Sequence, residues 1–383
     1  MAVEKYHKYE LAKPEADALF DIESEAGAYL RRVKQLEQPQ VIPCIRAKRI
    51  INIAYVPRGE HVVGVRISPV WAASHQDVKL QDIPGSIQNL EHVEELEIVI
   101  NSSRMGIPDE IGKLRSLKRL VLVTEYARAE GINSLPVSIG NLEGLEEMTI
   151  RLQLASLPDA IGNLKSLRSL VLWGNSLVAL PDAIGNMRSL EKLDVNRNHL
   201  ASLPDSIGML SSLKKLDAST NELIKIPDAI GDLSNLESLN LCENKLKAIP
   251  STIGKLGKLQ WLGFAKNEIS ELPDMFENLT SLKHLVMSEN RISRLPRSLS
   301  HLNGLRYFQL VDNALDHPLE ELVDIFGPLA LECRDRKNII HVSKFTIVGF
   351  PKAMHGELLT KESFVKKKRE WKKYIDGKWI NIE

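Results

Sequence analysis

Apolar residues in this chain recur in a fixed order that predicts one small structural unit. Around residue 170 they alternate with polar residues as in a half-buried strand, which places Leu170 and Leu172 inward and Trp173 outward. Pro181 follows, where a fixed φ and a missing N–H suit an extended turn, and Ile184 then returns toward the core. Each unit therefore predicts a short strand, a turn and a short helical or irregular segment.

Prolines show how regularly this unit repeats. Eleven of them mark it: Pro84, Pro108, Pro136, Pro158, Pro181, Pro204, Pro227, Pro250, Pro273, Pro296 and Pro318. Every gap from Pro158 to Pro296 is 23 residues. A fixed period of this length indicates a solenoid, in which each unit buries its apolar edge only against its neighbours.

One asparagine recurs in step with the prolines. Asn175 is followed at 23-residue intervals by Asn198, Asn221, Asn244, Asn267, Asn290 and Asn313. An amide side chain there can bond backbone groups that are buried where the chain leaves the strand, so we expect a structural role. The unit after Pro136 is one residue short and is expected to place Gln153 at this position.

The segment LPDAIGNLKSLRSLVLWGNSL (157–177) is the clearest copy of the unit. It resembles intracellular leucine-rich-repeat proteins of the Ras-group type, and the resemblance extends over about residues 60–318. It implies an α/β solenoid: a horseshoe with a parallel sheet on its concave face, which commonly binds another protein. A small GTPase or another signalling protein is the partner class that the resemblance implies.

The predicted organisation is a helical N-terminal cap (1–60), a solenoid of about ten repeats (61–318) and a mixed α/β C-terminal cap (319–383). The first cap is expected to be a helix that begins at Pro14, with apolar residues at helical spacing: Leu19, Ile22, Ala26, Leu30 and Val33. Residues 61–67 are expected to form the first strand of the sheet. In the second cap we expect a helix over 318–327, one or two strands over 339–349 and a hairpin at Asp376-Gly377.

Outward positions of strands stacked in register form columns, and two kinds of residue in them favour protein binding. Exposed aromatic residues dominate interface hot spots, and mixed charge suits a folded protein partner. The candidate partner-binding residues are Trp173, Asp194, Asn196, Arg197, Asp217, Asn240, Trp261, His284 and Tyr307. Asp194, Asp217 and Asn240 form a line of oxygen ligands, but no further acidic residue joins their column, so neither a metal nor another cofactor is predicted.

The composition of the chain indicates which class of partner and which cellular compartment to expect. The 50 Lys and Arg residues balance the 50 Asp and Glu residues, which gives no reason to expect nucleic acid. The three cysteines predict no disulfide framework, and neither a signal peptide nor a membrane-spanning stretch is evident. The chain is therefore expected to be cytoplasmic.

A non-enzymatic scaffold is the preferred interpretation because the histidines are dispersed and no catalytic motif is present. One alternative is an electrostatic tether to an anionic membrane or an acidic partner through the basic segment 361–373. A remote alternative is the resemblance of Cys333-Arg334-Asp335 to the C-x-D motif of bacterial leucine-rich-repeat ubiquitin ligases. The insertion at 125–131 is expected to be a surface loop, with a binding surface as the alternative.

Overall fold

The computed structural model describes residues 15, 17–19, 30–32, 51–58, 61–69, 83–100, 106–124, 134–310, 312–314, 331–334, 339–342, 345–348, 372–375 and 378–381. The chain divides into two compact units, Met1–Leu193 and Asp194–Glu383. The insertion at 125–131, the helix expected over 318–327 and most of the basic segment 361–373 lie outside the described residues.

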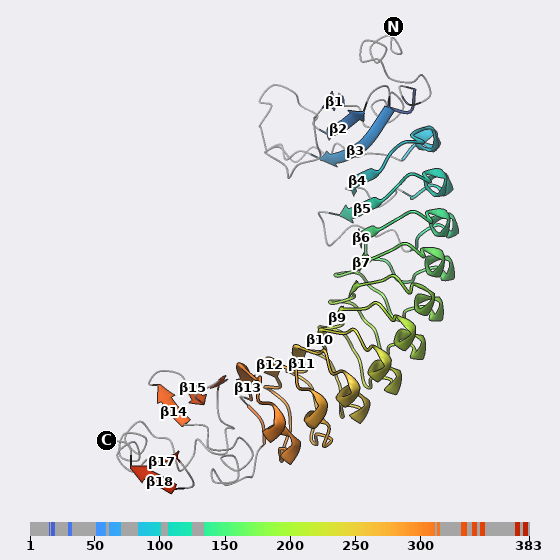
Figure 1. The fold of residues 1–383 in the computed structure, drawn as a ribbon. Helices are drawn as coiled ribbons and strands as arrows, with labels where there is room; N and C mark the ends of the chain where they lie inside the picture. Colours follow the sequence, from blue (N-terminus) through green and yellow to red (C-terminus); the bar gives the residue numbers. More distant parts are fainter. Residues whose placement is uncertain are drawn as a thin grey trace. The chain divides into compact units, whose positions relative to one another are not determined.

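The first unit is built on a sheet whose strands follow one another in chain order (Figure 1). These are β1 (Leu30–Arg32), β2 (Ile51–Arg58), β3 (His61–Pro69), β4 (Glu95–Ile100), β5 (Arg119–Thr124), β6 (Glu147–Arg151) and β7 (Ser169–Val171), while β8 (Lys192–Asp194) contains the unit boundary. All pairs from β3 to β7 are parallel, and β2 with β3 is an antiparallel pair. Its 3₁₀ helices are η1 (Gly85–Asn89), η2 (Asp109–Lys113), η3 (Val137–Asn141), η4 (Asp159–Asn163) and η5 (Asp182–Asn186).

The second unit continues the same repeat. Its parallel strands are β9 (Lys215–Asp217), β10 (Ser238–Asn240), β11 (Trp261–Gly263), β12 (His284–Val286) and β13 (Tyr307–Gln309). Its 3₁₀ helices are η6 (Asp205–Met209), η7 (Asp228–Asp232), η8 (Ser251–Lys255), η9 (Phe276–Asn278) and η10 (Arg297–His301). After β13 come β14 (Leu331–Arg334), β15 (Ile339–Val342) and β16 (Phe345–Val348), and the hairpin of β17 (Lys372–Ile375) and β18 (Lys378–Asn381).

The core of each repeat is a ladder of apolar side chains between strand and 3₁₀ helix. Leu170, Leu172 and Ile184 have no exposed surface, which confirms the predicted inward positions. The extended proline is confirmed as well: Pro181 precedes η5 at φ −67° and ψ 148°. Close stacking of neighbouring helices requires glycine, since a Cβ at Gly162 would lie 2.4 Å from the carbonyl oxygen of Ala183.

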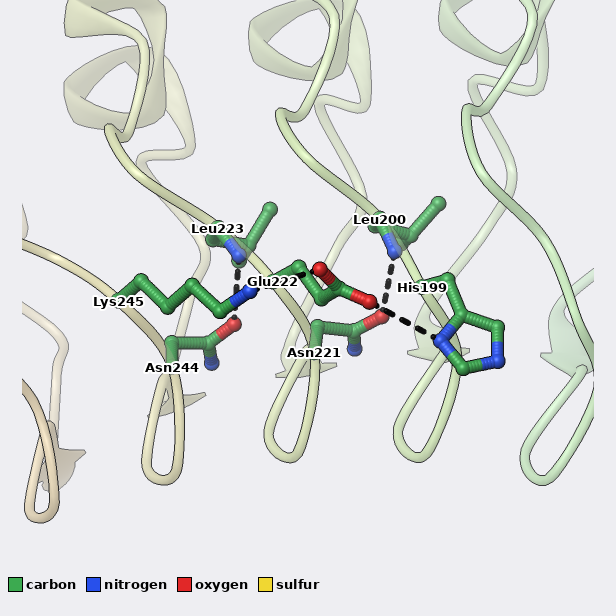
Figure 2. Close-up of polar contacts among 7 residues, drawn as sticks. All are labelled: His199, Leu200, Asn221, Glu222, Leu223, Asn244 and Lys245. Carbon is green, nitrogen blue, oxygen red and sulfur yellow. Dashed lines mark hydrogen bonds and ion pairs between the residues drawn. The ribbon is translucent and has the colours of Figure 1, made fainter.

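The asparagine ladder is confirmed, and Figure 2 shows two of its rungs. Asn221 accepts the backbone N–H of Leu200 through Oδ1 at 3.0 Å. Its Nδ2 donates to the carbonyl oxygens of Val195 and Ala218 at 3.0 and 3.1 Å. Each rung therefore joins the turn of its own repeat to that of the preceding repeat, and supplies partners for backbone groups that water cannot reach.

The short unit after Pro136 corrects one prediction. Gln153 does not take the asparagine position. It adopts a left-handed conformation with φ 62°, as Gly174 and Arg197 do immediately before their asparagines. Asn175 accepts the N–H of Leu154, as the other ladder asparagines do from the preceding repeat, and in this shortened unit it also accepts the N–H of Leu152.

The N-terminal cap also differs from the prediction. Glu15 and residues 17–19 are helical, but Leu30 lies in strand β1, paired parallel to β2. The strand at 61–67 is confirmed as β3, although β1 and β2 precede it in the sheet. Pairing with β2 has overridden the helical spacing of Leu30. Ile22, Ala26 and Val33 lie outside the described residues.

Two predictions for the C-terminal part concern described residues, and both are confirmed. The strands expected over 339–349 are β15 and β16, and the expected hairpin is β17–β18, with Tyr374 opposite Trp379. Within the described part of the chain, no helix has both the length and the apolar content needed to cross a membrane.

Candidate functional site

The candidate surface in the second unit is the solvent side of strands β9 to β13, called the sheet face below. The predicted columns are confirmed there. Ser238, Trp261, His284 and Tyr307 are successive partners in one row, and Asp217, Asn240, Gly263, Val286 and Gln309 are successive partners in the next. Strict 23-residue spacing keeps the strands in register, because a slip of one residue would turn every leucine out of the core.

Trp261, His284 and Tyr307 form the aromatic row on three adjacent strands. All three are partly buried. The rings of His284 and Tyr307 have centroids 6.2 Å apart and planes tilted by 42°. The Tyr307 hydroxyl donates to Oε1 of Gln309 at 3.3 Å, so its polar end is held in place. The row thus presents ring surface to solvent from fixed positions.

Trp261 adopts an orientation that the sequence did not reveal. A Cβ built on Gly263 would lie 2.2 Å from Cη2 of the indole and 3.0 Å from Sγ of Cys242. The indole therefore lies across the glycine instead of projecting freely. Burial raises the pKa of the Cys242 thiol to about 11, so this neighbour is a neutral thiol. The sequence does contain one indication of this orientation. Gly263 is the single glycine in the row of Asp217, Asn240, Gly263, Val286 and Gln309, and it leaves space for the indole.

The acidic residues of the candidate set are already hydrogen-bonded. Asp194 accepts from Nδ2 of Asn196 at 2.6 Å. Asp217 accepts from the Ser219 hydroxyl at 2.6 Å and from Nδ2 of Asn240 at 3.1 Å. These bonds fix the carboxylates along the strand ends, so they can present negative charge to a partner without first reorganising.

Arg197 is the exposed member of the set and stands in a left-handed turn with φ 53°. The equivalent turns of later repeats carry Thr220, Glu243 and Lys266. Glu243 accepts from Lys266 at 3.0 Å and from the Thr220 hydroxyl at 3.2 Å, and its bond to Lys266 holds its pKa below the ordinary value. This rim of the sheet face is polar and carries both signs of charge.

A second polar row lies two residues beyond these turns (Figure 2). Glu222 contacts Lys245 at 2.8 Å and His199 at 3.2 Å. The hydrogen bond from Lys245, followed by that from His199, holds the pKa of Glu222 below its ordinary value. Exposed pairs of this kind contribute little stability, so the row is a solvated edge.

Trp173 belongs to the first unit and is partly buried instead of standing free. The Arg151 guanidinium lies 4.2 Å from the centroid of its ring, a cation–π arrangement that covers one face of the indole. Sequence reasoning identified Trp173 as outward but did not identify its cationic partner on the neighbouring strand.

Comparisons with known proteins agree with this repeat geometry. A leucine-rich-repeat region model matches residues 207–330, and a leucine-rich-repeat model matches residues 158–223. The solved structure of a leucine-rich-repeat protein from Leptospira interrogans is 30% identical, over 64% of this chain and 68% of that one, with a TM-score of 0.53. The chain belongs to the leucine-rich-repeat family. Proteins of this fold are typically non-enzymatic scaffolds for protein–protein interaction.

Two further solved structures share the fold at lower identity. An internalin (inlF) of Listeria monocytogenes is 19% identical, over 70% of this chain and 88% of that one, with a TM-score of 0.50. The octameric complex of Latrophilin 3, Unc5D and the leucine-rich-repeat part of FLRT2 contains a chain that is 21% identical, over 70% of this chain and 79% of that one, with a TM-score of 0.54. A search of curated protein sequences finds no match.

Proposed function

We propose that this leucine-rich-repeat protein is a non-enzymatic scaffold that binds a folded partner protein on the sheet face of its second unit. The observation that carries the proposal is the aromatic row, which lies in register on a partly solvent-accessible face. Tyr and Trp supply large, stiff contact area and dominate interface hot spots. Truncating one such anchor costs about 2 kcal/mol or more of binding free energy.

The polar residues around the row support the same proposal. Asp194 and Asp217 are held by bonds to residues two positions further along the chain, and Arg197 is exposed at the rim. A partner with complementary charges would be oriented by this rim while the rings supply the contact area. Trp173, in the first unit, is proposed as a separate contact residue.

The proposed setting is intracellular and the proposed partner is a signalling protein, with small GTPases as the first class to test. This follows from the resemblance of the repeat to the Ras-group type. The FLRT2 complex supports a protein partner only in general, because FLRT2 there is assembled with other proteins.

An affinity capture with matched variants tests the proposal. The wild-type chain is compared with Trp261→Ala/Tyr307→Ala and with a control, Met209→Ala/Ile224→Ala, which removes exposed apolar side chains elsewhere in the unit. We expect a protein retained by wild type and control but lost by the aromatic variant, with all three folded by circular dichroism. Equal retention by all three would contradict the proposal. Repeating the capture with GTP-loaded and GDP-loaded lysate tests the GTPase class.

A further inference from the structure

Three potential metal ligands from distant parts of the chain meet in the first unit. They are Glu15 of the N-terminal helical segment, His61 at the start of β3 and His92 just before β4. Their ligand atoms all lie within 4.8 Å of one another. Oε1 of Glu15 is 3.0 Å from Nδ1 of His92 and 3.6 Å from Nδ1 of His61. These residues are separated by 46 and 31 positions in the sequence, so no local motif indicates the cluster.

The spacing of the three atoms suits a metal ion. Imidazole nitrogens and a carboxylate oxygen bound to zinc lie at 2.0–2.2 Å from it, which puts neighbouring ligands of a tetrahedron about 3.3 Å apart. The separations of Glu15 Oε1 from the two Nδ1 atoms, 3.0 and 3.6 Å, fall on either side of that value. Two histidines and one carboxylate also form a recurrent ligand set for zinc and for other first-row divalent ions.

The fold holds these ligands in place from behind. The carboxylate of Glu15 is only 3% exposed, and its second oxygen, Oε2, accepts the backbone N–H of Val62 at 2.8 Å. Oε1 is thereby directed toward the histidines. The backbone of the turn that carries His92 is held to β3, since the N–H of Glu94 donates to the carbonyl oxygen of Val63 at 2.9 Å, while the His92 side chain itself stays half exposed. A bond to the far oxygen of a ligating carboxylate, such as that from Val62 to Glu15, is typical of metal sites.

The two imidazoles lie against one another and would have to turn to bind a common ion. Their rings are stacked with centroids 3.6 Å apart and planes 24° from parallel. An ion must lie near the plane of each ring that binds it, so the rings have to splay as it enters. The side chain of His92 is 50% exposed, which leaves it room to turn.

We propose that Glu15, His61 and His92 bind one divalent transition-metal ion, such as Zn²⁺, and leave a fourth position to water. The ion would join the N-terminal helical segment to strand β3 and to the turn before β4. Because it binds the folded arrangement of three distant segments, it would stabilise this end of the chain. The proposal is independent of partner binding on the sheet face.

Titration of the full chain with Zn²⁺ tests the proposal. The protein is stripped with EDTA, dialysed and followed by isothermal titration calorimetry, and Co²⁺ is then added to record the visible absorption of a tetrahedral site. The ligand variants are His92→Ala and Glu15→Gln. The glutamine can still accept from Val62 N–H through its oxygen, but it turns an NH₂ group toward the histidines. His199→Ala is the matched control, since His199 also contacts a glutamate, Glu222, whose other charged partner is Lys245 instead of a second imidazole (Figure 2).

We expect one tight site in wild type and His199→Ala, and at least about 100-fold weaker binding in both ligand variants, since losing only a hydrogen-bond partner of a ligand already weakens metal binding about 10–100-fold. The thermal midpoint of wild type should rise with Zn²⁺, and that of folded His92→Ala should not. Absence of a stoichiometric site in wild type, or unchanged affinity in both ligand variants, would overturn the proposal.

Discussion

Trp261 lies across Gly263, two residues further along strand β11. A Cβ at that glycine would stand 2.2 Å from the indole, far inside any real contact distance. The glycine therefore sets how Trp261 presents its ring, and with it one end of the aromatic row.

Adding a methyl group at Gly263 should move the indole. In Gly263→Ala we expect Trp261 to rotate toward solvent, with a red shift of tryptophan emission and a stability loss of about 1–3 kcal/mol from overpacking. As a control, the same Gly263→Ala substitution is made in a Trp261→Phe protein, and its effect on tryptophan emission is recorded. An emission shift that persists there belongs to another tryptophan and would refute the assignment.

The asparagine ladder should matter far more than the ion pairs beside it. In Asn221→Ala several backbone groups lose their partners, and we expect a loss of about 2–3 kcal/mol in the free energy of unfolding by urea. Glu222→Gln is the neighbouring control: it removes two exposed ion pairs and should shift the urea midpoint much less. Comparable shifts for the two variants would contradict the structural role of the ladder.

Close stacking of the 3₁₀ helices predicts a sharp difference between two glycines of the first unit. A Cβ at Gly162 would meet Ala183 at 2.4 Å, whereas one at Gly144 would meet nothing closer than 3.4 Å. We expect Gly162→Ala to lower stability by about 1–3 kcal/mol or more, and Gly144→Ala to change it much less. Thermal denaturation of both variants measures the difference, and equal midpoints would show that the helices can separate at no cost.

Cys242 should be unreactive until alkaline pH. Its pKa is raised by burial from 9.0 to about 11, so the folded chain favours the protonated thiol. The contribution of this pKa shift to the free energy of unfolding is fully present below pH 9 and is lost as the pH rises through about 11. With Cys44→Ser and Cys333→Ser in place, the alkylation rate of native protein should have its midpoint near pH 11, against about 9 in denaturant. A native midpoint near 9 would mean that the thiol is open to water.

The sequence predicted the repeat, the register and the asparagine ladder because each follows from a strict period. A shift of one residue would bury polar groups and expose leucines in every unit at once. It did not predict β1 and β2, because the pairing of Leu30 with Ile53 on the next strand overrode the helical spacing of Leu30. The orientation of Trp261, the cation over Trp173 and the meeting of Glu15 with His61 and His92 depend on contacts between segments, which no single-segment pattern contains.

The most direct test of the central claim is hydroxyl-radical footprinting of the chain with its captured partner. Oxidation of Trp261, His284 and Tyr307 should fall several-fold in the complex, while oxidation of Met209, on the 3₁₀-helix side, should stay unchanged. Protection of Met209 with the aromatic row still oxidised would place the partner on the opposite side of the repeats and contradict the account.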